Sequence, residues 1–214
     1  MPRVSPDYLD ARRQQILDAA RRCFVRNGFH ATSMQDVLAE ADLSAGAVYR
    51  YFRGKEDIIA AIADTALAEI SAVAEALRAE PLPSLEDAVG QLLAAVERLD
   101  AAQDVTNIAV QAWAEALRSP ALARRVAATV GAMRRAFAEL VTAYAERGLV
   151  PADVAPESVA KVLTGIVPGY AVQRAVLGDV DATAYRDGLR ALLAAQLQRP
   201  PAVSPPRPDP GARR

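Results

Sequence analysis

The side chains best suited to bind phosphates and base edges are concentrated between residues 32 and 58. Within this stretch, Val48 and Phe52 lie four residues apart, a spacing that predicts the inward face of a helix. Arg50 then faces outwards, and the small residues at positions 45–47 keep the helix narrow at its N-terminus. An outward arginine reads guanine in the major groove, binds a phosphate or stays in solvent. The pattern predicts a helix that inserts its N-terminus into the major groove of DNA.

A second short helix is expected immediately before this one. Thr32 and Gln35 have the spacing of a capping box, in which the hydroxyl accepts a hydrogen bond from a first-turn N–H. Asp42 lies in the turn that follows, and Ser44 is placed to cap the next helix. Two short helices joined by a tight turn form a helix-turn-helix, whose second helix enters the major groove. The apolar stripe predicted for the first of these helices consists of Met34, Val37, Leu38 and Ala41.

This stretch resembles the DNA-binding domain of the TetR family of transcriptional regulators. The residues that match the family's motif in register are Thr32, Ala41, Ser44, Gly46, Tyr49, Tyr51, Phe52, Lys55 and Glu56. Asp42 departs from the motif, because the family usually has glycine in the turn, but aspartate tolerates left-handed backbone better than most residues. The residues predicted to bind DNA are Thr32, Ser33, Ser44, Ala45, Gly46, Ala47, Tyr49, Arg50, Tyr51 and Lys55.

Among these residues, Tyr51 and Lys55 are expected to contact the phosphate backbone. The alternatives are core packing for Tyr49 and Tyr51 and a solvated position for Lys55. The family register favours phosphate contact for the tyrosines. Lys55 is one of only two lysines in the chain, and it stands at a motif position.

Composition excludes several classes of protein. The 214 residues include one cysteine, Cys23, and one histidine, His30. Neither a disulfide framework, a cysteine-based zinc site nor histidine-dependent catalysis is therefore expected. We predict no catalytic residues, no metal and no cofactor other than a small-molecule effector. The N-terminal segment lacks the apolar centre of a signal peptide, and no apolar stretch is long enough to span a membrane. These features predict a cytoplasmic protein without membrane contact, and the resemblance to the TetR family implies a bacterial protein that is associated with the nucleoid when bound to DNA.

The net charge of −1 is the sum of two unlike parts. Residues 1–55 carry nine Arg and Lys against six Asp and Glu, a net charge of +3. The remainder carries 16 against 20, a net charge of −4. A mildly basic N-terminal part suits a nucleic-acid partner, and a charge of only +3 predicts weak non-specific binding that falls steeply with salt.

Helical periodicity predicts an all-α protein with about nine helices and no strand. The expected helices cover residues 7–27, 32–41, 44–52, 55–80, 84–101, 104–118, 120–147, 156–177 and 181–198. Gly28 is expected to end the first helix, and Pro168 to interrupt and kink the eighth. The predicted domains are a helix-turn-helix domain at 1–54, a connecting helix at 55–80, a ligand-binding and dimerisation domain at 81–199 and a disordered Pro-rich tail at 200–214.

The resemblance also implies a ligand cavity in the larger domain and a dimer formed through the last two helices. The candidates for the cavity lining combine aromatic surface with polar groups, and they are Asn107, Gln111, Trp113, Phe137, Tyr144, Tyr170 and Gln173. The residues predicted to share the dimer face of the last helix are Tyr185, Leu189, Leu192, Leu193 and Gln196. Two recognition helices related by a two-fold axis would read a palindrome.

These features predict a homodimeric repressor that an unidentified small-molecule effector releases from a palindromic operator in double-stranded DNA. Effector binding is expected to swing the connecting helix, and by linkage DNA must weaken effector binding by the same factor. The alternative is a constitutive regulator or activator whose larger domain binds a protein or no ligand. An α-helical enzyme or lipid carrier is a third hypothesis, and the lack of a catalytic constellation counts against the enzyme.

Overall fold

The computed structural model describes residues 5–79, 81–151 and 153–197. Over these ranges the chain forms helices and no strand, which confirms the predicted all-α class. The helices are α1 (Pro6–Ala31), α2 (Met34–Ala41), α3 (Ala45–Tyr49), α4 (Lys55–Ala76), α5 (Leu85–Gln103), α6 (Val105–Ala116), α7 (Pro120–Glu146), α8 (Pro156–Val176) and α9 (Ala182–Leu197). The tail predicted at 200–214 lies outside the described residues. Within the described ranges, no helix combines the length and apolar character needed to cross a membrane.

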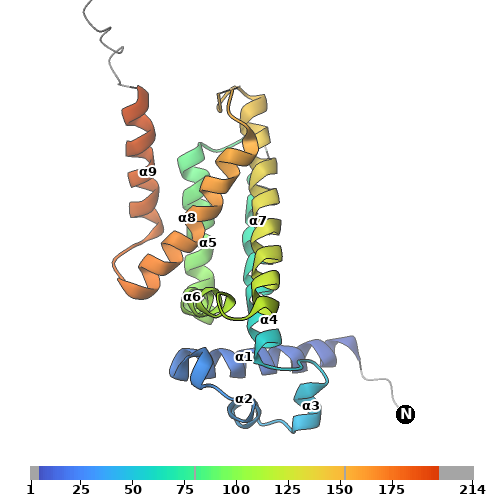
Figure 1. The fold of residues 1–214 in the computed structure, drawn as a ribbon. Helices are drawn as coiled ribbons and strands as arrows, with labels where there is room; N and C mark the ends of the chain where they lie inside the picture. The colour runs from blue at the N-terminus through green and yellow to red at the C-terminus, as the bar shows by residue number, and fades with distance from the viewer. Residues whose placement is uncertain (1–4, 80, 152, 198–214) are drawn as a thin grey trace, which may run out of the picture.

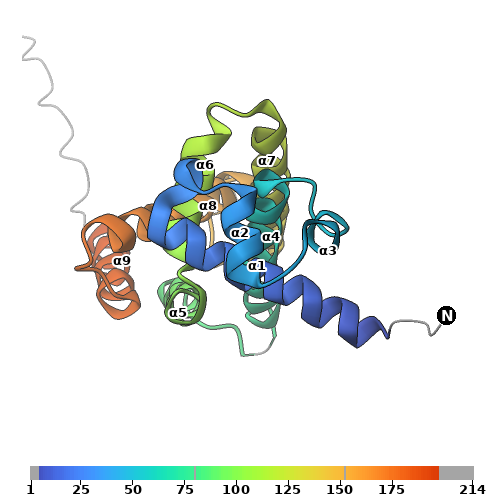
Figure 2. The ribbon, with the colours of Figure 1, turned by 90° about the horizontal axis from the view of Figure 1, so that it is seen from below.

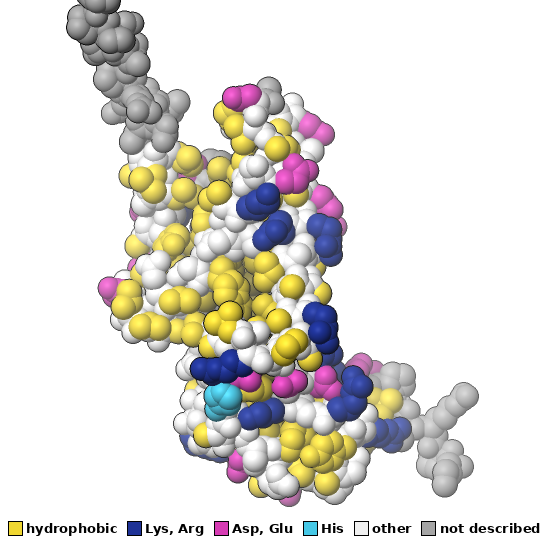
Figure 3. Space-filling view, in the orientation of Figure 1, with side chains coloured by type: hydrophobic (Ala, Val, Ile, Leu, Met, Phe, Trp, Pro, Cys, Tyr) yellow, Lys and Arg dark blue, Asp and Glu magenta, His cyan; other side chains and the backbone are white. Residues whose placement is uncertain are grey.

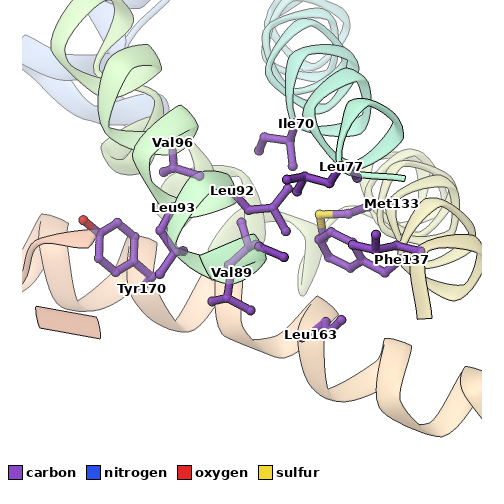
Figure 4. Packing of buried hydrophobic residues seen from close by; sticks show 14 of the residues in the cluster. Ile70, Leu77, Val89, Leu92, Leu93, Val96, Met133, Phe137, Leu163 and Tyr170 are labelled. Carbon is purple, nitrogen blue, oxygen red and sulfur yellow. The ribbon is translucent and has the colours of Figure 1, made fainter. Parts of the chain in front are cut away.

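The helices form a small layer beneath a larger bundle (Figure 1). The small layer consists of α1–α3, and α4 rises from it alongside α7. The two halves of α4 belong to different cores, because residues 58–62 pack with α1–α3 whereas Ala66, Ile70 and Ala74 pack with the bundle. Figure 4 shows part of the larger core, where α4, α5, α7 and α8 contribute side chains. Since α4 ends at Ala76 rather than near residue 80, the connecting helix is shorter than predicted.

Serine side chains begin several helices by accepting a hydrogen bond from a first-turn N–H. Ser44 caps α3 in this way, as predicted. The capping box of α2, however, is formed by Ser33 and Asp36 rather than by Thr32 and Gln35. Ser33 Oγ accepts from the Asp36 N–H at 3.2 Å, and the Asp36 carboxylate accepts from the Ser33 N–H at 2.7 Å. The capping box begins one residue later than predicted because the side chain of Thr32 is buried.

Two residues with positive φ shape the small layer. Gly28 has φ +79° and ψ 159°, so it breaks α1. The predicted positive φ at Gly28 and the end of the regular helix there are confirmed, and a short helical segment follows as far as Ala31. Asp42 has φ +52° and ψ +49° and ends α2 in the left-handed conformation. Aspartate thus occupies the geometry that the turn requires, although it lacks the freedom of glycine.

Proline at position 168 does not interrupt α8, contrary to the prediction. The helix runs from Pro156 to Val176. A proline removes a single backbone hydrogen bond from the helix. Leu163, Val167 and Tyr170 are buried on both sides of it and anchor the two halves to one core.

Candidate DNA-binding surface and ligand cavity

The short helix α3 is anchored on one side and exposed on the other. Val48 is fully buried and Phe52 is only 4% exposed, so both lie in the core of the small layer, as predicted. Tyr49 is 46% exposed, and Arg50 is exposed beside it. Figure 2 shows α3 at the outer edge of the layer, seen from below. The predicted direction of Arg50 is confirmed by this arrangement.

The beginning of α3 is also open to solvent. Ser44, Ala45 and Gly46 are exposed, and Ala47 is half-buried. A Cβ added at Gly46 would meet no atom within 4 Å. Such a narrow, open end can approach the floor of a groove. Tyr51 is half-buried against the core of the small layer, so its ring has a packing role in addition to any contact with DNA.

Thr32 does not lie on the surface that the prediction assigned to it. The residue is 1% exposed. Its hydroxyl donates hydrogen bonds to the carbonyls of Gly28, at 2.7 Å, and Cys23, at 3.2 Å. The Gly28 carbonyl also accepts from the Thr32 N–H at 3.2 Å, so Thr32 is held against α1 at the break and one turn before it. Ser33, the next residue, is exposed, and its N–H and its hydroxyl both donate to the Asp36 carboxylate at 2.7 Å.

Lys55, predicted as a phosphate contact, is half-buried, and its ammonium binds the end of α1. Its Nζ donates to the carbonyls of Phe29, at 2.7 Å, Thr32, at 3.0 Å, and His30, at 3.2 Å. The ammonium also lies 4.5 Å from the centre of the Phe29 ring. The carbonyls at the end of a helix carry partial negative charge and attract a cation. Lys55 therefore ties the start of α4 to the end of α1.

A second contact ties the start of α4 to the bundle. The Asp57 carboxylate accepts hydrogen bonds from the Arg53 N–H at 3.1 Å and from Arg125 of α7 at 2.8 Å. Burial raises the pKa of the Asp57 carboxyl, but the Arg53 N–H and the charge of Arg125 lower it more, and the net pKa lies below its ordinary value. The carboxylate therefore stays charged and holds α7 against α4.

Gln111 of α6 bridges the bundle and the small layer at the break in α1. Its Oε1 accepts from the Phe29 N–H at 2.6 Å, and its Nε2 donates to the Phe24 carbonyl at 3.2 Å. The conformation of Gly28 turns the Phe29 N–H out of the helical ladder, and the glutamine supplies the acceptor. Nearby, His30 Nε2 lies 3.2 Å from Glu115 Oε2 of α6. The sequence did not predict this role of Gln111, which was instead a candidate for the lining of the ligand cavity.

Replacing Gln111 by leucine should expose the Phe29 amide to exchange. The leucine removes the acceptor, and the loss of one such bond corresponds to about 10-fold faster hydrogen exchange. Gln35→Leu is the matched control, because it makes the same change at an exposed position of α2 and should leave Phe29 protected. Exchange of backbone amides followed by NMR measures both variants. Equal protection of Phe29 in the leucine variant and the unaltered protein would contradict this bridge.

An apolar cavity of about 120 Å³ lies where α4, α6, α7 and α8 meet. Figure 3 shows hydrophobic side chains gathered over the region where α6, α7 and α8 come together. The lining consists of Ile62, Ala63, Ala66, Leu67, Ile70, Val105, Ile108, Ala109, Ala112, Trp113, Thr129, Val130, Met133, Val167, Pro168 and Ala171. Trp113 is the one predicted pocket residue among them, and Pro168 contributes to the wall.

The other predicted pocket residues have structural contacts elsewhere. Phe137 is fully buried in the larger core. Asn107 accepts a hydrogen bond from Gln111, and Gln173 donates one to the Tyr185 hydroxyl. Of these residues, Phe137 is buried in the core, Asn107 is exposed and Gln173 is half-buried, and the two amides have partners within the protein, as polar groups in a folded chain usually do. The residues that line this cavity are instead mainly aliphatic.

Two buried tyrosines illustrate this point. The Tyr144 hydroxyl donates to the Pro83 carbonyl at 2.8 Å, and burial raises its pKa to about 12. The Tyr170 hydroxyl donates to Glu97 at 2.6 Å; burial and this carboxylate both raise the pKa of Tyr170. Figure 4 shows Tyr170 directed towards α5, beside Leu93. Neither hydroxyl is available to a ligand.

Further exposed apolar residues lie on the last two helices. Exposed apolar residues of this α8/α9 surface are Val162, Val172, Val176, Leu177, Leu192 and Leu193. Gly165 and Gly169 lie between the valines of α8, and a Cβ at either glycine would meet no atom within 4 Å. Tyr185 and Leu189, predicted to lie on the outer face of α9, instead pack against the larger core. The side chain of Gln196 lies outside the described residues.

Comparison with known proteins assigns both parts of the chain to described families. Residues 16–62 match the bacterial regulatory proteins of the tetR family, and residues 83–198 match the C-terminal domain of BetI-type transcriptional repressors. The solved structure of Salmonella enterica GusR is 30% identical, with a TM-score of 0.68, and the match covers 90% of this chain and all of that chain.

Curated relatives match either a short part of this chain at higher identity or most of the chain at lower identity. A helix-turn-helix-type transcriptional repressor of Mycobacterium tuberculosis is 40% identical over 74 residues, which cover 35% of this chain and 40% of that protein. Three relatives that are 38–41% identical are each matched over only 33–40% of their own length. The regulator UidR of Escherichia coli K12 is 25% identical over 191 residues, which cover 86% of this chain and 92% of that protein.

The exposed α3 of a helix-turn-helix, joined to a larger helical domain with an apolar cavity, defines a DNA-binding transcriptional regulator. The matches over both parts of the chain make the assignment more specific. The protein belongs to the TetR family of bacterial regulatory proteins, with a larger domain of the BetI-type repressor kind.

Proposed function

We propose that the protein is a homodimeric repressor that leaves a palindromic operator when a small-molecule effector enters the cavity. The observation that carries the proposal is a set of shared residues. Ile62, Ile108 and Ala112 line the cavity and also pack in the core of the small layer. A molecule that displaces these side chains disturbs the support of α3. Occupation of the cavity is thereby coupled to the shape of the DNA-binding surface.

Two helices carry this coupling. On α6, Ala109 and Trp113 line the cavity, while Gln111 holds the break in α1. On α4, Ile62 and Ala66 line the cavity, and the same helix begins at the Lys55 contact. A shift of either helix moves the small layer relative to the bundle. The effector then favours a population of dimers whose two α3 helices no longer match the groove spacing.

DNA recognition in this proposal uses the predicted residues other than Thr32 and Lys55. These are Ser33, Ser44, Ala45, Gly46, Ala47, Tyr49, Arg50 and Tyr51. Hydroxyls and backbone N–H groups contact phosphates, and Arg50 reads a base edge. Thr32 and Lys55 support these residues from inside the small layer instead of contacting DNA.

Replacing Arg50 by alanine tests base recognition. An operator is first selected from random-sequence DNA with the unaltered protein. Arg50→Ala should lower operator affinity by about 1–3 kcal/mol and relax the base preference at one position of each half-site. Titrations against operator and random DNA measure both effects, and Arg134→Ala, an exposed arginine of α7, is the control. An equal loss on both DNAs would assign Arg50 to phosphate instead.

The α8/α9 surface is the proposed dimer interface. Exposed valines and leucines form a patch of the kind that marks a protein interface. Gly165 and Gly169 leave room for the backbone of α8 to approach a partner helix closely. Two-fold symmetry then places one α3 from each subunit about 34–36 Å apart, one turn of DNA.

A further inference from the structure

The lining of the cavity contains no charged side chain. None of its sixteen residues is Lys, Arg, Asp, Glu or His. The side-chain polar atoms on the lining are the Trp113 indole N–H and the Thr129 hydroxyl. The hydroxyl donates to Asp64 at 3.0 Å, so its proton is already engaged. The cavity therefore offers a ligand hydrocarbon contacts and very few hydrogen bonds.

This lining discriminates strongly between classes of small molecule. A carboxylate or phosphate that enters an apolar site without a partner loses several kcal/mol of hydration free energy. A sugar would bury several hydroxyls, each at a cost of about 1–3 kcal/mol. A hydrocarbon instead gains about 25 cal/mol for each Å² removed from water. The chemistry of the walls favours an uncharged apolar molecule.

The size of the cavity sets a second limit. Its volume is about 120 Å³, whereas sites for drug-sized ligands enclose about 300–1,000 Å³. An apolar cavity of about 150 Å³ in another protein binds benzene. One ring with a short substituent therefore matches the space. A long acyl chain or a fused-ring compound exceeds it unless the helices separate.

Trp113 lies on the lining and is 43% exposed, so it stands where the cavity meets solvent. Ile108 and Ala112, on the same helix, are 2% exposed and form the inner wall. A ring that enters past Trp113 thus reaches two side chains shared with the core of the small layer. The entrance of the cavity and two of the side chains shared with the core of the small layer therefore lie on the same helix, α6.

We propose that the effector is an uncharged, mainly hydrocarbon molecule of single-ring size, such as an alkylbenzene. This inference rests on the proposed function, because it assigns a ligand class to the same cavity. It excludes carboxylates and glycosides of the same ring as effectors.

The experiment uses Trp113, the single tryptophan of the chain, as a reporter of occupation. Tryptophan emission of the full-length protein is titrated with toluene in sealed cells, with benzoate and with phenyl glucoside. Toluene should change the emission and saturate, whereas the other two should leave it unchanged. Ala109→Leu, which fills the cavity, should weaken toluene binding at least about 10-fold, and Ala127→Leu, on an exposed part of α7, should not. Thermal melts verify that both variants fold.

The outcomes separate this inference from the proposed function. Saturable binding of benzoate or phenyl glucoside, or no saturable response to toluene, overturns the ligand class. Binding of toluene that Ala109→Leu leaves unchanged places the site elsewhere and also overturns the inference. A mobility-shift assay on the selected operator then measures whether toluene releases the protein from DNA. If toluene binds in the cavity and the complex with DNA persists, the ligand class stands and the release mechanism fails.

Discussion

Val172→Glu should yield a monomer that binds the operator at least about 100-fold more weakly than the unaltered protein. Val172 is 45% exposed on the α8 part of the α8/α9 surface. In a symmetric dimer the substitution introduces two carboxylates into an apolar interface, where an unpaired charge is costly. A monomer contacts one half-site, and each lost base contact costs about 1–3 kcal/mol. The large effect on DNA thus follows from symmetry, although position 172 lies outside the small layer.

Sedimentation equilibrium measures the association, and operator titration measures the affinity. Leu149→Glu is the matched control, because Leu149 is 62% exposed but lies between α7 and α8 rather than on the α8/α9 surface. The control should remain a dimer with unchanged affinity for DNA. If Val172→Glu remains dimeric while Leu149→Glu dissociates, the interface lies on another face.

Lys55→Ala should lower the free energy of unfolding by about 2–3 kcal/mol. The variant loses charge-assisted hydrogen bonds to the carbonyls of Phe29, His30 and Thr32, and hydrogen bonds to charged groups contribute about 1.5–3 kcal/mol. Lys161, the other lysine of the chain, is exposed on α8. Lys161→Ala should change stability by less than about 0.5 kcal/mol. Urea unfolding followed by circular dichroism measures both variants.

The salt dependence of DNA binding distinguishes a structural lysine from a phosphate contact. Loss of a phosphate contact lowers the slope of log K against log salt by about 1. We expect Lys55→Ala to keep the slope of the unaltered protein when measured well below its unfolding temperature. A lower slope together with unchanged stability would restore Lys55 to the DNA-binding surface.

The helix-turn-helix was predictable from local patterns. The inward faces of α2 and α3 follow from apolar spacing, and Ser44 caps α3 through an N–H three residues away. Asp42 adopts the left-handed turn that its place in the motif implied. Each of these features depends on residues within one or two helical turns. Sequence patterns report such short-range preferences directly.

The roles of individual functional side chains were less predictable. Lys55 stands at a position where the family motif suggested a phosphate contact, yet its partners are carbonyls 23–26 residues earlier in the chain. Gln111 meets a backbone N–H 82 residues away. Neither partner is identifiable until the break at Gly28 has turned the end of α1 towards α4 and α6. The residue type indicated that each side chain makes polar contacts, but the sequence did not indicate which groups it contacts.

For this protein, the amino-acid sequence alone determined the all-α class, the helix-turn-helix, the outward direction of Arg50 and the family. These properties depend on periodicity and on capping between near neighbours. Only the tertiary structure decided that Thr32 and Lys55 face inwards and that the cavity is lined by aliphatic side chains, with Trp113 near solvent. A cavity forms where side chains from four separate helices fail to fill the space between them. That volume depends on how the helices pack, and no single segment of the chain contains it.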